Sequence, residues 1–465
     1  MNKSAFRGLL RLAAFLMVFA AVICLGDVFF LRTDLFARRM LLEMQERDDL
    51  ELVFIGSSVC RDHVNAQLIS EATGKTAFNA SIPCLAMQGS IALTEELYRT
   101  NAPETIVLVV EPYTFETERE GIEAEDTMMP WLSSFRTKLD YYKRLVAADG
   151  WYMDRILLFR DMGAQTPLDI AKTVGLRFFP HRTIELLGNE SRDGNIPVTY
   201  QEQGFVRYET DLRADDAVKE KLKRQVTGWE YGLLPASKQM LLEYRDLLAA
   251  HGTELIVLIY PNMNAHNLAE PSFLGYNRSL TFFCRNNGIE CVNFALAKPE
   301  LLPNLDPYYF DIYHVNGEGA DLFSSAVARW LNLRDAGEDT TPLFYGSNEE
   351  YLQAFDTVTN AWAERYDPAE DWDPAREQDE GAVRFLADGE MDLYLANCNH
   401  SPFYTPEYRF FLLDGEMEVP LTPWQQEGIL RCGAGDLDHR VLRVYARLTG
   451  QQSAVYYDFR TSPEY

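Results

Sequence analysis

The sequence predicts an α/β protein built on a parallel sheet between helices, followed by an all-β sandwich-like region. Strand-like apolar runs alternate with helical patterns up to about residue 335, as in a helix-covered parallel sheet. Beyond that point short runs with a two-residue period follow, and a long apolar segment stands at the N-terminus. We therefore expect a transmembrane anchor with a cytoplasmic tip over residues 1–34, an α/β domain over 35–335 and a β domain over 340–465.

The N-terminal segment between Leu9 and Leu31 predicts a membrane-spanning helix. It holds about 23 mainly apolar residues, enough to cross a hydrocarbon core of ~30 Å. Lys3, Arg7 and Arg11 lie on its N-terminal side, so the positive-inside rule places the N-terminus inside and the remainder outside the cytoplasm. A cleaved signal peptide is the alternative, but no small-x-small pattern directly ends the apolar core. We expect a single-pass cell-membrane protein with an extracytoplasmic α/β domain.

The α/β domain is predicted from short buried strands separated by amphipathic helices. The strand-like runs are residues 52–56, 76–80, 105–111, 254–260 and 289–293, and the clearest helical patterns are 87–100, 237–250 and 274–287. A last helix is expected after Gly317, because apolar residues there recur at helical spacing.

A helical insertion is predicted at about residues 116–236, where the regular alternation is interrupted. It contains amphipathic segments at 135–147 and 152–160, followed by a polar stretch rich in Asn, Gly and Asp. We interpret the insertion as a lid or a docking face on the α/β domain.

The C-terminal region predicts an all-β domain of about 120 residues. Alternating runs occur at 383–388, 391–397, 407–413, 439–448 and 453–460. Binding a glycan, contacting a partner and acting as a spacer are all compatible with this pattern. The acidic stretch at residues 364–380 lacks a spaced calcium-loop signature, which favours a solvated linker.

Composition narrows the class of partner. The formal net charge of −27 argues against nucleic acid, because binding to phosphate backbones needs clustered positive charge. No group of Cys and His residues has the spacing of a zinc site. We therefore expect neither a metal nor another cofactor.

Seven cysteines are present, and Cys24 lies in the apolar N-terminal segment. The other six allow fifteen pairings. Proximity in the sequence suggests three disulfides, with free buried thiols as the alternative in each case. The suggested pairs are Cys60 with Cys84, Cys284 with Cys291, and Cys398 with Cys432.

Three residues far apart in the chain suggest a serine nucleophile with its base. Ser58 follows a predicted buried strand that breaks at Gly56, which is where a doubly wound sheet presents its ligands. Asp311 stands three residues before His314 on a loop that opens the last helix. A carboxylate at this spacing can hydrogen-bond one ring nitrogen and leave the other for a serine hydroxyl.

These motifs resemble the SGNH/GDSL hydrolase superfamily, and more closely its membrane-anchored branch, which includes teichoic-acid D-alanylation and alginate O-acetylation proteins. The matching blocks are residues 56–63, 78–81 and 311–314. The resemblance implies that Ser58 is the nucleophile, His314 the general base and Asp311 its orienting partner.

The resemblance also implies an oxyanion hole made by the first two blocks. Backbone N–H groups of Ser58 and Ala80 are the candidates, with the Asn79 side chain as a further donor. The Gly-x-Asn-Asp block of free-standing esterases is absent, because the strand at 105–110 is followed by Glu111 and Pro112.

Three further residues are candidates for substrate binding. Arg61 follows the nucleophile block, and Asn262 and His266 lie in the loop after the strand at 254–260. The alternatives are a salt bridge at a helix start for Arg61 and turn formation for the loop. His63 and Cys60 lie near the nucleophile but further along its helix, and we rank them below His314 and Ser58.

The predicted function is a serine acyl-esterase or O-acyltransferase that acts on ester-linked acyl groups of a cell-surface polysaccharide, with acetyl as the expected group. A membrane-bound O-acyltransferase is the expected protein partner. One alternative is a non-catalytic scaffold or glycan-binding partner in such a complex. The other is a general surface esterase or lipase.

Overall fold

The fold was analysed in a computed structural model of the chain. It describes residues 7–8, 11–15, 17–19, 22, 34–115, 128–149, 166–193, 195–212, 235–263, 272–311, 313–347, 350–351, 383–388, 391–396, 406–414, 417–426, 429–433, 437, 440–448 and 455–460.

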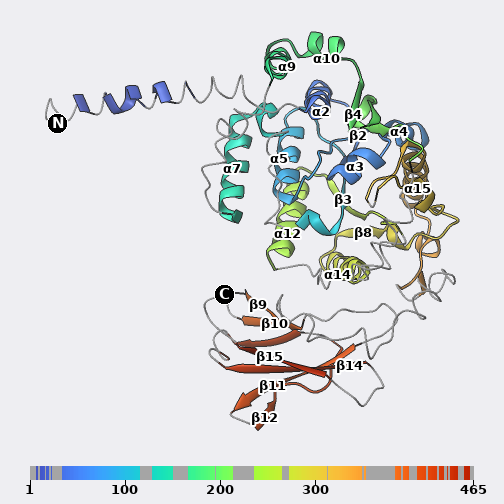
Figure 1. The fold of residues 1–465 in the computed structure, drawn as a ribbon. Helices are drawn as coiled ribbons and strands as arrows, with labels where there is room; N and C mark the ends of the chain where they lie inside the picture. Colours follow the sequence, from blue (N-terminus) through green and yellow to red (C-terminus); the bar gives the residue numbers. More distant parts are fainter. Residues whose placement is uncertain are drawn as a thin grey trace.

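A five-stranded parallel sheet forms the centre of the α/β domain, in the order β2-β1-β3-β7-β8. Figure 1 labels β2, β3 and β8 of this sheet. Its strands are β1 (Leu52–Ile55), β2 (Ala77–Asn79), β3 (Thr105–Val110), β7 (Glu254–Ile259) and β8 (Glu290–Asn293). Each lies within two residues of its predicted run. Because all five strands are parallel, their carboxyl ends share one edge of the sheet, and β1 lies between β2 and β3 at that edge.

Both faces of this sheet are buried. Along β1, Val53 and Ile55 contribute to one hydrophobic cluster, while Leu52 and Phe54 contribute to the other. This two-residue alternation explains why the strand is apolar throughout instead of alternating with polar residues.

Helices cover each face (Figure 1). On the first lie α2 (Leu35–Glu46), α5 (Met87–Leu97), α12 (Pro235–Ala250) and α14 (Ser272–Asn286). On the second lie α3 (Ser58–His63), α4 (Ala66–Thr73) and α15 (Gly317–Asp335). The last helix is the one predicted after Gly317, and Asn316 caps it by accepting a hydrogen bond from Gly319 N–H.

The insertion is only partly helical. It contains α7 (Phe135–Asp149), α9 (Pro167–Phe178) and α10 (Pro180–Leu187); the helical segment expected at 152–160 lies outside the described residues. Its polar stretch forms a three-stranded antiparallel sheet of β4 (Glu190–Asp193), β5 (Ile196–Tyr200) and β6 (Val206–Tyr208). This sheet was missed because β4 is exposed along its whole length and has no apolar alternation.

The C-terminal region contains two antiparallel sheets, in the orders β13-β10-β9 and β12-β11-β14-β15. Their strands are β9 (Val383–Asp388), β10 (Met391–Ala396), β11 (Pro406–Asp414), β12 (Met417–Pro420), β13 (Ile429–Gly433), β14 (Val441–Leu448) and β15 (Val455–Arg460). The alternating runs predicted five of these strands. No predicted run covers β12 or β13, which have 4 and 5 residues.

The transmembrane helix in the predicted fold class is corrected by the structure. Among the residues that the structure describes, no helix is long and apolar enough to cross a bilayer. Of the segment between Leu9 and Leu31, only residues 11–15, 17–19 and 22 are described, all as helix. The prediction rested on the length and apolar composition of that segment and on the basic residues before it.

Two of the suggested disulfides are also corrected. Cys60 is a free, buried thiol, and its Sγ lies 3.7 Å from Asn79 Oδ1 instead of bonding Cys84. Cys284 and Cys291 are free thiols as well, and Cys291 Sγ lies 3.9 Å from the Thr281 hydroxyl. Proximity in the sequence therefore did not translate into bonded pairs. The third pair is outside the described residues, because Cys398 is not among them.

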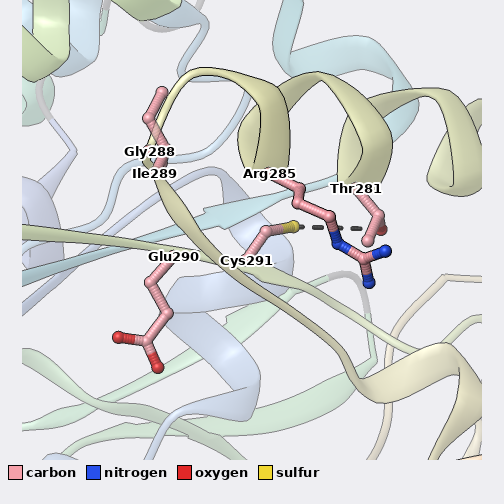
Figure 2. Close-up of a pocket in the computed structure, with 6 residues that line it drawn as sticks. All are labelled: Thr281, Arg285, Gly288, Ile289, Glu290 and Cys291. Atoms are coloured by element: carbon pink, nitrogen blue, oxygen red, sulfur yellow. Dashed lines mark hydrogen bonds between the residues drawn. The ribbon is translucent and has the colours of Figure 1, made fainter.

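A small pocket opens beside Cys291, between α14 and the amino end of β8 (Figure 2). Thr281 and Arg285 line it from α14, and Gly288, Ile289, Glu290 and Cys291 line it from the turn and strand that follow. Since β8 is parallel to β1, this pocket lies at the opposite edge of the sheet from Ser58.

Candidate active site

Ser58, His314 and Asp311 meet at the carboxyl edge of the sheet. Ser58 is the first residue of α3, three residues after β1 ends. Its Oγ lies 3.0 Å from His314 Nε2, and His314 Nδ1 lies 2.9 Å from Asp311 Oδ2. Two consecutive hydrogen bonds thus join the serine hydroxyl to the carboxylate, across 256 residues of sequence.

The loop before α15 holds the aspartate and histidine in this arrangement. Asp311 Oδ1 accepts hydrogen bonds from the backbone N–H groups of Tyr313 (2.7 Å) and His314 (2.6 Å). Phe310 N–H donates to the His314 carbonyl at 3.0 Å. One carboxylate oxygen therefore closes the turn while the other faces the imidazole. This division explains the need for three-residue spacing.

The pKa values of the pair move in opposite directions. Burial raises the pKa of Asp311, but the hydrogen bond and charge of His314, with the two backbone N–H groups, bring it below its ordinary value. Burial lowers the pKa of His314, but the hydrogen bond and charge of Asp311 raise it overall, with smaller contributions from the charges of Asp62 and Glu111. The site therefore favours an ionised aspartate that stabilises a protonated histidine.

Gly56 permits the close approach of β1, α3 and β3 at the nucleophile. A Cβ atom at this position would lie 2.7 Å from Cys60 Cβ and 2.8 Å from the Val109 carbonyl oxygen. Ser57 then caps α3, its Oγ accepting a hydrogen bond from Val59 N–H at 3.4 Å. The Gly-Ser pair before the nucleophile is thus explained by packing and capping.

Two of the three predicted oxyanion donors are committed elsewhere. Ala80 N–H donates to the Phe54 carbonyl at 2.8 Å, which extends the pairing of β2 with β1. The fully buried Asn79 donates through its side-chain amide to the carbonyls of Cys60 and Val64, at 2.8 Å each. Asn79 therefore satisfies carbonyls at the end of α3, and both candidates are corrected. Ser58 N–H remains, because the first N–H of a helix has no intrahelical partner.

Arg61 is held by neighbouring side chains. Its guanidinium forms an ion pair with Asp62 at 2.5 Å and donates to the Tyr208 hydroxyl at 3.2 Å. Burial opposes this positive charge, but the charge of Asp62 raises the pKa of Arg61 above its ordinary value. The arrangement matches the salt-bridge alternative for Arg61 and does not direct it toward a substrate.

Tyr208 was missed in the sequence and connects the insertion to the site. Its ring stacks on Phe310 with centroids 4.9 Å apart, and Phe310 stacks in turn toward His314 at 6.1 Å. The β6 strand thereby packs beside the loop that carries Asp311 and His314. No motif in the sequence marks this contact, because it depends on how the insertion folds back.

His63 is a buried structural neighbour of the site. Its Nε2 accepts a hydrogen bond from Val315 N–H at 3.0 Å, and its ring lies 5.8 Å from that of His314. Burial, then the charges of His314 and Arg61, lower the pKa of His63 well below its ordinary value. A neutral ring is needed for Nε2 to accept. Cys60 is likewise unsuited as a nucleophile, because burial raises the pKa of its thiol.

The loop after β7 reaches the same edge. Asn262 is half-buried, and the preceding Pro261 carbonyl accepts a hydrogen bond from the Tyr309 hydroxyl at 2.6 Å. His266 lies outside the described residues. Within the described part of the chain, no three His, Cys, Asp or Glu side chains gather in a group that could hold a metal ion.

No family model matches the chain, and no curated protein matches it. Among solved structures it is similar to a putative acylhydrolase from Bacteroides fragilis, with 10% identity, a TM-score of 0.30 and coverage of 62% of this chain and 89% of that one. A putative lipolytic protein of the G-D-S-L family from Desulfitobacterium hafniense shows 10% identity and a TM-score of 0.27, covering 60% of this chain and 98% of that one.

A third similar structure is a gut microbial diltiazem-metabolizing enzyme, with 8% identity, a TM-score of 0.23 and coverage of 84% of this chain and 71% of that one. The chemistry of the site rests on its own geometry.

Proposed function

We propose that this protein is an SGNH/GDSL-type serine hydrolase or acyltransferase that cleaves an ester by way of an acyl-serine. The observation that supports it is the chain of hydrogen bonds from Ser58 Oγ through His314 to Asp311. A serine hydroxyl is a weak nucleophile on its own, and an adjacent oriented base is what activates it.

In the first half-reaction, His314 Nε2 takes the Ser58 proton as Ser58 Oγ attacks the acyl carbonyl carbon. The carbonyl oxygen becomes an oxyanion, toward which the Ser58 N–H is the available donor of the predicted set. Asp311 keeps the proton on Nδ1 and stabilises the imidazolium. The carbon–oxygen bond to the alcohol then breaks, and His314 returns the proton to the departing oxygen.

In the second half-reaction, an acceptor hydroxyl attacks the acyl carbon while His314 takes its proton. The bond from that carbon to Ser58 Oγ then breaks, and His314 returns the proton to Ser58. Water as acceptor yields hydrolysis, and a sugar hydroxyl yields transfer. The outcome depends on whether the site excludes water and positions the other hydroxyl.

For the substrate, we propose an ester-linked acetyl group on an extracytoplasmic cell-surface polysaccharide, with a membrane-bound O-acyltransferase as the partner. Support for these finer assignments comes from the sequence resemblance to polymer-acylation proteins. The two alternatives differ from this proposal in measurable ways. A general surface esterase would act without a polymer substrate, and a scaffold would not need Ser58 for its function.

The deciding experiment exposes the full-length protein to p-nitrophenyl acetate and records p-nitrophenol release and intact mass. Wild type should gain one acetyl group or turn over, and the Ser58→Ala variant should do neither. A folded wild type that neither labels nor releases p-nitrophenol above the variant would contradict the proposal and favour the scaffold. Adding an acetylated polysaccharide then separates a polymer-acting enzyme from a general esterase.

A further inference from the structure

Glu111 stands where the third sequence block of the resembling esterases is absent, and the sheet places it beside the nucleophile. Ile55 of β1 pairs with Leu108 of β3 in parallel register. Ser58 stands three residues after Ile55, and Glu111 stands three residues after Leu108. The contact observed at this point is a hydrogen bond from Ser57 Oγ to Glu111 Oε1.

The backbone of Glu111 is fixed by the turn that follows β3. Its N–H donates to Thr114 Oγ1 at 3.0 Å, and its carbonyl accepts from Thr114 N–H at 3.0 Å. Phe115, at the end of this turn, accepts a hydrogen bond from Ser237 Oγ of α12 at 3.2 Å. The half-buried carboxylate is therefore presented on a braced segment of the sheet edge.

His314 is surrounded by charged and titratable side chains from several elements. Its own loop supplies Asp311 and Tyr313, α3 supplies Asp62 with its partner Arg61 and the neutral His63, and the end of β3 supplies Glu111. The ring of Tyr260, which follows β7, lies tilted against that of His63 with centroids 4.5 Å apart. Asp62 is paired with Arg61, and Glu111 accepts a hydrogen bond from the Ser57 hydroxyl.

We propose that Glu111 is a positioning residue with two tasks. It fixes the turn that carries Ser58 through the hydrogen bond from Ser57, and its negative charge stabilises the imidazolium of His314 while Ser58 is without its proton. The role of Glu111 in turnover rests on the proposed function. Its effect on the protonation of His314 applies equally to the protein without substrate. Asp311 acts on Nδ1 by direct contact, and Glu111 acts from a separate element of the sheet.

The physical basis is Coulombic. A carboxylate close to an imidazole in a partly buried site favours its charged form. Glu111 is among the groups that raise the pKa of His314, after burial, which lowers it, and after Asp311 and Asp62, which raise it more. Removing only the charge of Glu111 should lower that pKa.

The test is an NMR titration of the full-length protein labelled with ¹³C-histidine, with the His314 signal assigned from a His314→Asn variant. Glu111→Gln keeps an acceptor for Ser57 and removes the charge, so the His314 pKa should fall by about 0.5 or more. Glu111→Asp keeps the negative charge, so the pKa of His314 should stay close to its wild-type value. Glu104→Gln, on an exposed glutamate just before the other end of β3, is the matched control and should leave His314 unchanged.

The same variants are then assayed for ester turnover across pH. In Glu111→Gln, the acidic limb of kcat/KM should move to lower pH. The plateau should fall by about threefold or more, because a pKa decrease of about 0.5 corresponds to that loss of charge stabilisation in the transition state. Ser57→Ala, which retains the charge, should lower kcat without moving that limb.

An unchanged His314 titration in folded Glu111→Gln would overturn the inference, whatever the activity of the protein. A shifted titration with no Ser58-dependent turnover in wild type would instead contradict the proposed function and leave the electrostatic assignment intact. The two failures are therefore distinguishable.

Discussion

The two edges of the central sheet use similar residue types for different ends. At the carboxyl edge, Asp311 faces His314, whose other nitrogen contacts a serine hydroxyl. At the amino edge, Arg334 of α15 pairs with Glu254 and Glu290 at the starts of β7 and β8. The Asp311–His314 pair contacts the Ser58 hydroxyl, whereas Arg334 contacts carboxylates that are partly exposed to solvent. A pair of charged side chains can take part in catalysis only where it also contacts a reactive group, such as the Ser58 hydroxyl.

The largest expected effect comes from removing the nucleophile. Ser58→Ala should reduce ester turnover by ~10³-fold or more, because no acyl-serine can form. Intact mass and turnover with p-nitrophenyl acetate measure this loss. A circular-dichroism melt near that of wild type would show that the fold survives, and substantial remaining turnover would exclude Ser58 as the nucleophile.

Asp311→Asn should reduce kcat by roughly 10²–10⁴-fold. The amide oxygen can still accept from the Tyr313 and His314 N–H groups, but an amide NH₂ facing Nδ1 favours the tautomer with the proton on Nε2. His314 then cannot accept the Ser58 proton. Turnover within threefold of wild type, in a folded variant, would show that Asp311 closes the turn and nothing more.

The pH dependence should follow His314. Its pKa is raised in the folded protein, and the base must be neutral to accept a proton, so kcat/KM should fall as pH drops through a value above the ordinary ~6.5 of histidine. Below that value the decline should approach tenfold per pH unit. An acidic limb centred well below 6 in the pH profile would contradict the raised pKa.

The smallest effect is expected at the amino edge. Arg334→Ala removes ion pairs with Glu254, Glu290 and Asp335, whose side chains are partly exposed, and should lower the free energy of unfolding by about 1 kcal/mol. The loss should shrink in high salt, and ester turnover in the folded variant should be unchanged. A loss of turnover comparable to that of Asp311→Asn would break the distinction between the two edges.

Local sequence patterns predicted the sheet better than they predicted the contacts around the site. The three inner strands β1, β3 and β7 are almost wholly apolar, because both faces of the sheet are buried there, and this made each of them recognisable. The β4–β6 sheet was missed because its outer strand is exposed. The partners of polar side chains were harder to predict than the strands. Asn79 and Arg61 both lie near Ser58, but Asn79 binds backbone carbonyls and Arg61 binds Asp62.

The sequence by itself determined the strand order along the chain, the break at Gly56 and the Asp311–His314 spacing, because each depends on residues close together in the chain. Only the tertiary structure brought Ser58 to His314 and placed Ser57 against Glu111. It also directed Ala80 N–H to Phe54 and packed Tyr208 on Phe310. These contacts join segments separated by dozens to hundreds of residues, and parallel pairing with helical crossovers decides which of them meet.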